Sequence, residues 1–217
     1  MDSSVFNYNS VFYNREFENI LVSIINCYKL MITRKVILPN DENEIRNKIV
    51  GDEFLSNNQV RNQLGVTDYI FEPEAPEKTG RADIKIISRL STFFDTKAYY
   101  VIECKRLDNK NTTGTTGLNA KYIYEGIARF VSGKYSMYGK TAGMMGFVVE
   151  KMDIHQNVSD IITLLNQHFG HINTEETFTH KTIVSSFKFS YFSRHKIGGI
   201  SKIIYHLMLD FSDNIAV

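Results

Sequence analysis

The sequence predicts an α/β fold in which helices flank a central mixed β-sheet. Two runs, 98–104 and 143–150, are almost continuously apolar and rich in β-prone residues, which is typical of strands buried on both faces. Segments with apolar residues at helical spacing alternate with such strands after a leading helix. The chain has 217 residues, of which 43% are hydrophobic, so it can bury a core, and we expect one domain over 1–217.

The first half opens with two predicted helices. Residues 15–32 carry apolar side chains at helical spacing, including Phe17, Ile20 and Ile24. Pro39 interrupts the chain, and Asp41 can cap the next helix. We therefore expect helices at 15–32 and 41–55, then strands at 69–72, 82–87 and 98–104, with a turn region at 73–80.

The second half continues the alternation. The polar stretch 108–117, which contains four Thr and two Gly, is typical of a surface loop. Gly126 lies within the next predicted helix, where it would permit close packing against the sheet. We expect helices at 118–132 and 156–169, and strands at 143–150, 183–192 and 203–211.

Composition and motifs restrict the class of protein. Two cysteines, Cys27 and Cys104, cannot build a disulfide framework or a zinc ribbon, so we expect reduced thiols and a cytoplasmic location. The apolar stretch 17–32 contains Glu18 and Lys29 and is too short and polar to span a bilayer, so we expect no membrane partner. The sequence contains no phosphate-binding loop, zinc-ligand cluster or serine-hydrolase motif.

Charged residues near the ends of two consecutive predicted strands indicate a candidate catalytic site. Asp83 begins one strand, and Glu103 and Lys105 end the next one. Because alternate residues of a strand share a face, Glu103 and Lys105 point the same way, and Cys104 points into the core. If the strands pair, Asp83 can lie beside Glu103, and two carboxylates on one wall suit Mg²⁺. A neighbouring lysine can orient or deprotonate a water and offset charge on a phosphate.

The spacing of an acid two residues before a lysine is not specific by itself. It also begins at Asp83, Asp95 and Asp108. Only the pair at Glu103 ends a buried apolar strand, where charged groups are costly unless they are paired or bind a metal. The alternative interpretation is that Glu103 and Lys105 mark the point where the strand leaves the core.

The second predicted helix supplies a further acid. At about 100° per residue, Glu42 and Glu53 fall on its apolar side, whereas Glu44 falls nearly opposite. Glu42 could therefore reach the strand ends and complete the metal site. The alternative is an acid of the first helical turn that the helix dipole favours. We expect Glu44 to be solvated, and the sequence leaves open which of the three is the helix acid.

These residues together resemble the PD-(D/E)XK restriction-endonuclease-like nuclease superfamily. The resemblance covers about 41–150, including the helix acid, the hairpin with Gly80-Arg81-Ala82-Asp83 and the strand with Glu103-Cys104-Lys105. It implies a restriction-endonuclease-like core with the order αβββαβ. Residues 1–40 would then form an N-terminal helical extension and residues 170–217 a strand-rich C-terminal one. Ala82 stands where the superfamily has a proline before the first acid.

The resemblance implies metal-dependent hydrolysis of phosphodiester bonds. Asp83, Glu103 and the carbonyl of Cys104 would bind Mg²⁺, for which Mn²⁺ could substitute. Lys105 would position the attacking water, and Glu42 would support the metal shell. We expect an endonuclease that acts on DNA, in restriction or anti-phage defence, with a homodimer as one option for cutting both strands. The alternatives are an RNA nuclease or toxin-like effector on the same fold, and a catalytically inactive nucleic-acid-binding subunit.

Two further features concern the binding surface. Lys121, Glu125 and Arg129 lie at intervals of four, which favours an exposed salt-bridge ladder, although Lys121, Tyr122 and Arg129 could instead face the cleft. The formal net charge of +1 divides into −3 over 1–104 and +4 over 105–217. This later basic excess could follow a phosphate backbone, with binding that weakens as salt rises. The alternative is a solvated basic face.

Overall fold

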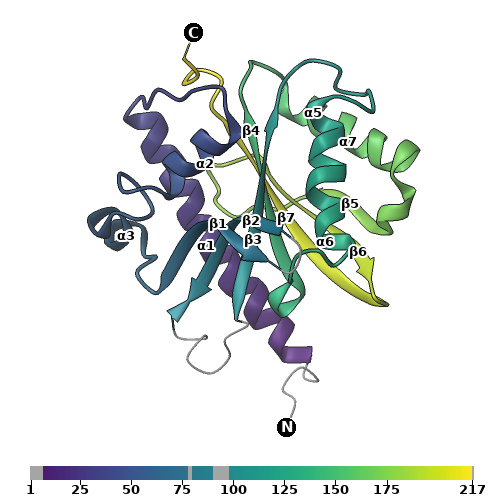
Figure 1. Ribbon diagram of the computed structural model, residues 1–217, viewed down its shortest axis with the longest axis horizontal. Coiled ribbons are helices and arrows are strands. Elements are labelled where there is room, and N and C mark those ends of the chain that lie inside the picture. The colour runs from purple at the N-terminus through teal and green to yellow at the C-terminus, as the bar shows by residue number, and fades with distance from the viewer. Residues whose placement is uncertain (1–6, 78–79, 90–97, 217) are drawn as a thin grey trace.

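The computed structural model describes residues 7–77, 80–89 and 98–216 (Figure 1). Helices flank a seven-stranded mixed sheet with the strand order β1-β2-β3-β4-β7-β6-β5. The strands β3, β4 and β7 are parallel to one another, and antiparallel pairs extend the sheet on both sides of them. This confirms the predicted fold class, an α/β protein with a mixed sheet between helices.

The strands are β1 (Tyr69–Glu77), β2 (Gly80–Ser88), β3 (Tyr99–Leu107), β4 (Thr141–Val148), β5 (Thr174–His180), β6 (Ser190–Ile197) and β7 (Ile200–Asp210). The helices are α1 (Asn7–Thr33), α2 (Glu42–Val50), α3 (Asn58–Leu64), α5 (Leu118–Lys121), α6 (Ala128–Val131) and α7 (Ile154–His168). A π-helical segment, Tyr122–Ile127, joins α5 to α6. The three pieces therefore make one continuous helical element over the predicted span 118–132.

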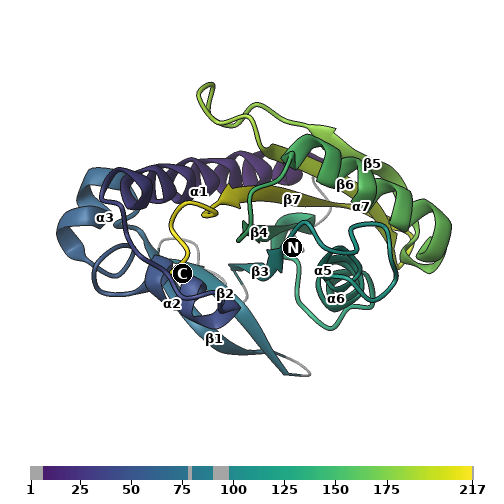
Figure 2. The same cartoon turned by 90° about the horizontal axis from the view of Figure 1, so that it is seen from above.

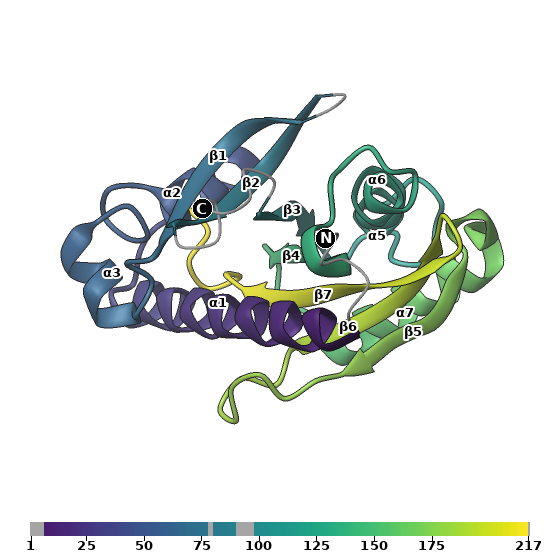
Figure 3. The ribbon, with the colours of Figure 1, turned by 90° about the horizontal axis from the view of Figure 1, so that it is seen from below.

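Helices cover both faces of the sheet. Figures 2 and 3 show α1 on one side of β3, β4 and β7 and α5–α6 on the other. On β3, Ile102 and Cys104 belong to the core under α1 and α2, whereas Val101 belongs to the core under α5–α6 and α7. Glu103 and Lys105 alternate with these residues on the Val101 side. Two charged side chains therefore lie on the face that the α5–α6 element covers.

The C-terminal strands belong to the same sheet as the predicted core. β7 pairs with β4 from Thr141 opposite Ile203 to Val148 opposite Asp210. The segment 170–217, expected as an extension, thus supplies three of the seven strands. Its strands broaden the sheet on the side of β4 that faces away from β3.

The predicted turn region at 73–80 is wrong, because β1 continues through it to Glu77. Pro73 and Pro76 both lie within this strand. β1 is at the edge of the sheet, where a missing N–H leaves no gap between paired strands. The position of β1 at the edge therefore explains why the two prolines, which predicted a turn, are tolerated in a strand.

Other differences lie where the local sequence signal is weak. The predicted strand at 183–192 begins only at Ser190. The strand β5 was not expected, because its polar sequence lacks an apolar alternation, and it is the other edge strand. The helix α3 was not expected either, although Asn57 caps it by accepting hydrogen bonds from two backbone N–H groups. In the described part of the chain, no helix is long and apolar enough to cross a membrane.

A chain of buried polar side chains links the sheet to the π-helical segment. The Tyr122 hydroxyl is 2.9 Å from His206 Nδ1, and Ser193 Oγ is 2.8 Å from Nε2 of both His206 and His195. Both imidazoles are fully buried. Burial lowers the pKa of His195 to about 4 and that of His206 well below its ordinary value. Both rings are therefore neutral in the folded protein at neutral pH.

We predict that this burial makes stability fall in acid. Below a pH of about 6.5, the ordinary pKa of histidine, His195 is protonated in the unfolded chain. In the folded protein it stays neutral until the pH falls to about 4, so protonation favours unfolding in between. The contribution to the free energy of unfolding is about 1.4 kcal/mol per pH unit. Urea unfolding from pH 7 to pH 4 should show a shallower pH dependence for His195→Gln than for the wild type. The exposed His168→Gln is the control, and equal slopes for all three proteins would contradict the prediction.

Candidate active site

The candidate site lies where β2 and β3 stop pairing. Their backbone register ends with Ile84 opposite Ile102. At the next position, the carboxylate of Asp83 replaces a backbone partner, and its Oδ2 accepts a hydrogen bond of 2.7 Å from the N–H of Cys104. The structure thus places Asp83 against β3, as the pairing of these strands predicted. Side chains rather than the sheet ladder fill the space beyond it.

The Lys105 ammonium is surrounded by oxygen atoms. Its Nζ lies 2.7 Å from Cys104 O, 3.0 Å from Glu42 Oε1, 3.0 Å from Glu103 Oε1 and 3.9 Å from Asp83 Oδ2. We call these four oxygens the oxygen cage. The Lys105 side chain is only 7% exposed and that of Glu103 is fully buried. All five residues predicted for the site therefore converge on one point.

Electrostatics keep this lysine charged. Burial opposes the ammonium form, but the carboxylates of Glu103, Asp83 and Glu42 outweigh it, so the pKa of Lys105 is raised. Burial, reinforced by the nearby charge of Asp83, raises the pKa of Glu103 to about 7, although Lys105 and Arg129 oppose the rise. Lys105 is therefore a hydrogen-bond donor in this state and not a base.

The helix acid is Glu42. Asp41 caps the helix α2 and places Glu42 in its first turn, at the edge of β3. Its Oε1 accepts from Lys105, and its Oε2 accepts a hydrogen bond of 2.9 Å from the backbone N–H of Arg106. Glu44 is exposed, as expected, and the exposed carboxylate of Glu53 pairs with Lys48 instead.

A buried arginine that the sequence analysis missed supports Asp83. Arg46 on α2 is only 2% exposed, and its guanidinium lies 3.3 Å from Asp83 Oδ1 and 2.9 Å from Glu74 Oε1. It also donates hydrogen bonds to the side chains of Asn43 and Asn47. Arg46 lies four residues after Glu42 on α2 and directly follows the apolar Ile45. Its position on the buried side of the helix, near Glu42, could therefore have been predicted from the sequence.

The prediction of an exposed salt-bridge ladder in the helical element α5–α6 is wrong for Arg129. The π-helical segment Tyr122–Ile127 alters the spacing of four. Arg129 instead donates to Glu103 Oε1 at 2.5 Å and to the Tyr135 hydroxyl at 2.8 Å. Arg129 therefore contacts one of the predicted site acids, whereas Tyr122 is fully buried and hydrogen bonded to His206, and Lys121 is exposed.

Gly126 lets this helical element approach the sheet. A Cβ atom there would overlap the terminal methyl of Met144 and lie 3.8 Å from Cγ of Lys105. The predicted close packing at Gly126 is therefore confirmed. The close approach places the α5–α6 element directly over the Lys105 stem, and the guanidinium of Arg129 within reach of Glu103.

Three of the four cage oxygens come from the groups that the sequence analysis predicted as ligands of a hard divalent cation. Carboxylate and carbonyl oxygens are the ligands that Mg²⁺ prefers, and Asp83, Glu103 and the carbonyl of Cys104 supply them. Glu103 Oε2 is buried and has no hydrogen-bond partner among the described residues, so one carboxylate oxygen is left for such a ligand. Within the described ranges, no three His, Cys, Asp or Glu side chains are grouped so that they could hold a metal ion. A metal here would thus depend on two carboxylates and the backbone carbonyl.

The other acid-x-Lys sequences do not form comparable sites. Lys85 lies 4.0 Å over the ring of Tyr99, and Lys110 is exposed and pairs with Glu150 at the surface. The sequence at Asp95 lies outside the described residues. Among the described examples, the one at Glu103 is distinguished by burial and by convergence with Asp83.

The basic C-terminal stretch is partly neutralised. Between 177 and 209, Lys181 pairs with Glu18 at 3.0 Å and Arg194 pairs with Glu176 at 2.9 Å. These two cations are therefore engaged within the protein. Binding of a phosphate backbone by the other basic residues of this stretch stays a prediction, as does its alternative, a solvated basic face.

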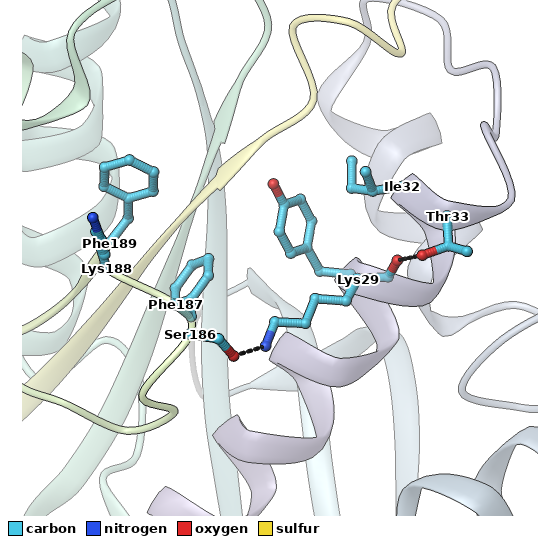
Figure 4. A pocket seen from close by; sticks show the side chains of 8 residues that line it. Lys29, Ile32, Thr33, Ser186, Phe187, Lys188 and Phe189 are labelled. Atoms are coloured by element: carbon cyan, nitrogen blue, oxygen red, sulfur yellow. Dashed lines mark hydrogen bonds between the residues drawn. The ribbon is translucent and has the colours of Figure 1, made fainter.

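A pocket of about 520 Å³ lies away from these residues, between α1 and the segment before β6 (Figure 4). Lys29 lines this pocket and donates a 2.6 Å hydrogen bond to the hydroxyl of Ser186. None of its lining residues is acidic: they are Tyr28, Lys29, Ile32, Thr33, Ser186, Phe187, Lys188 and Phe189. The pocket therefore lacks the carboxylates that metal-dependent hydrolysis needs.

Comparison with known proteins returned no relative. No family model, no curated protein and no solved structure matches this chain. What the site does must therefore be argued from its own geometry and chemistry.

We predict that Arg46 is worth far more to stability than a neighbouring exposed arginine. Arg46→Met would leave Asp83 without its buried guanidinium, and removing one partner of a buried pair costs about 3–5 kcal/mol. Arg81 also pairs with Glu74 but is 71% exposed, so Arg81→Met should change the free energy of unfolding by no more than about 0.5 kcal/mol. Urea unfolding measures both variants. Equal losses would show that the buried contact of Arg46 is unimportant.

Proposed function

We propose that this protein is a metal-dependent nuclease with a restriction-endonuclease-like core, and that it hydrolyses phosphodiester bonds in DNA. The observation that carries the proposal is the convergence of Asp83, Glu103 and Lys105 where β2 and β3 stop pairing, with Glu42 beside them. These residue types are the ones that the PD-(D/E)XK resemblance assigns to metal binding and water positioning. Their meeting in space makes a chance occurrence of the sequence pattern a poor explanation.

The order of elements supports the same proposal. The segment from α2 to β4 runs helix, three strands, helix, strand, once the short α3 is set aside. This is the αβββαβ order that the resemblance implies. The acids also lie where that core would carry them, on the first helix and on its second and third strands.

The chain's own residues divide the chemistry among them. Asp83, Glu103 and the carbonyl of Cys104 would hold Mg²⁺, which when bound offsets charge on a phosphate and favours ionisation of a water. Lys105, kept as an ammonium, would donate a hydrogen bond to the attacking water or to a phosphate oxygen. Glu42 would orient the Lys105 ammonium, to which it is already hydrogen bonded.

Arg129 would contribute a second positive group for the substrate. Its side chain is 29% exposed, although its NH1 reaches the buried Glu103. A guanidinium with this partial exposure can also meet a phosphate oxygen from solvent. The site would thus combine acids that hold a metal cation with two positively charged side chains, Lys105 and Arg129, that could contact a phosphate.

We predict that Asp83→Asn and Lys105→Met each lower Mg²⁺-dependent cleavage of duplex DNA by about 100-fold or more, because each removes a group that would act on the reacting atoms. Circular dichroism should show that both variants remain folded. The matched control is Lys110→Met, which removes an exposed lysine from another acid-x-Lys sequence and should cut like the wild type. Wild-type rates in the folded Asp83→Asn and Lys105→Met variants would refute the proposed mechanism.

We also predict that the wild type cuts DNA in preference to RNA of the same sequence, in Mg²⁺ and in Mn²⁺. Parallel incubations resolved on denaturing gels measure the two rates, and Asp83→Asn controls for contaminating nucleases. Preferential cutting of RNA would replace the DNA proposal with an RNA nuclease on the same fold. Binding of DNA without cutting in either metal would replace it with a binding subunit.

A further inference from the structure

Lys105 occupies the position in which the cage oxygens would otherwise meet a metal ion. Its ammonium lies within 3.0 Å of Glu42 Oε1, Glu103 Oε1 and Cys104 O. We propose that the caged Lys105 ammonium and Mg²⁺ exclude each other, so that the lysine keeps the site closed until the metal displaces it. This inference rests on the proposed metal-dependent function.

The exclusion follows from shared ligands. Glu103 and Cys104 would each give an oxygen to the metal, and each now accepts a hydrogen bond or ion pair from Lys105 Nζ. Asp83 Oδ2 is 3.9 Å from the same nitrogen. A divalent cation at these oxygens would be repelled at close range by an ammonium held in a site from which water is largely excluded. The two cations therefore occupy the cage in turn.

Glu42 gives the displaced ammonium a place to go. Its carboxylate is 29% exposed, whereas that of Glu103 is fully buried, so Glu42 marks the open side of the cage. The groups proposed to bind the metal directly are Asp83, Glu103 and the carbonyl of Cys104, so Glu42, which would support the metal shell without binding the ion, remains available to the ammonium. The flexible four-carbon stem of Lys105 can therefore swing toward Glu42 without losing that partner. This movement would carry the ammonium from the metal position to the side from which a substrate phosphate arrives.

The same arrangement accounts for the close approach of the three carboxylates to one another. Glu42, Asp83 and Glu103 would repel one another if no cation lay between them. Of the three cations described at the site, Arg46 pairs with Asp83, Arg129 pairs with Glu103, and Lys105 pairs with all three carboxylates. The Lys105 ammonium thus neutralises the carboxylates that the metal ion would otherwise neutralise. Binding of Mg²⁺ requires that Lys105 loses its contacts with Glu103 and the carbonyl of Cys104.

The test is Mg²⁺ binding by Lys105→Met, measured by isothermal titration calorimetry without nucleic acid. Removal of the competing ammonium should tighten Mg²⁺ binding by about ten-fold or more relative to the wild type. Lys110→Met removes one exposed charge and should leave the affinity unchanged, which controls for net charge. Adding Asp83→Asn to Lys105→Met should abolish the gain. Affinity in Lys105→Met that equals or falls below that of the wild type would overturn the proposal.

A second measurement uses the wild type and does not depend on the folding of a variant. An acylating reagent labels free lysine amines, and peptide mass spectrometry gives the rate at each site. The caged Lys105 should react slowly without metal, and Mg²⁺ should speed its labelling several-fold relative to the exposed Lys110. An unchanged or slower rate at Lys105 in saturating Mg²⁺ would overturn the exclusion.

The two proposals fail separately. If Mg²⁺ binds more tightly to Lys105→Met but the wild type cuts no nucleic acid, the exclusion stands and the nuclease proposal fails. If the wild type cuts DNA with Mg²⁺ but neither readout responds to Lys105, the nuclease proposal stands and the exclusion fails.

Discussion

The charge of Lys105 is the constraint on which the candidate site depends. A strand buried on both faces carries this ammonium and the carboxylate of Glu103 on the side that α5–α6 covers. Buried charges are tolerated only when they are paired and hydrogen bonded. Asp83 from β2 and Glu42 from α2 meet that requirement, and each contacts Lys105 from a different direction. The Lys105 ammonium on β3 thus links α2 and β2 to that strand.

The surrounding fold explains how these groups come to meet. β2 and β3 separate after Ile84 and Ile102, which leaves room for side chains where a ladder would otherwise continue. Gly126 brings the helical element close over that gap, and the π-helical turn directs Arg129 into it. Backbone geometry therefore places a cluster of charged side chains inside an otherwise apolar layer.

Much of this could be predicted from local pattern. The apolar runs of β3 and β4 and the acids at 42, 83 and 103 gave the fold class and the residues that converge. Three features could not, because they depend on tertiary context. β1 keeps Pro73 and Pro76 only because it is an edge strand. Arg129 contacts Glu103 because the π-helical segment Tyr122–Ile127 changes the spacing between residues of the helix. The local sequence contains no pattern that predicts a π-helical segment. β5 is held by pairing with β6, since its own sequence is polar.

The proposed nuclease requires a divalent metal at the oxygens around Lys105. The most direct measurement is a crystal structure of the wild-type protein grown with Mn²⁺, in which anomalous scattering locates the metal independently of the refined side chains. The account predicts an anomalous peak bound by Asp83, Glu103 and the carbonyl of Cys104, with the Lys105 ammonium moved toward Glu42. Absence of Mn²⁺ from the cage at saturating concentration, with Lys105 still in contact with Glu103 and Cys104 O, would contradict it.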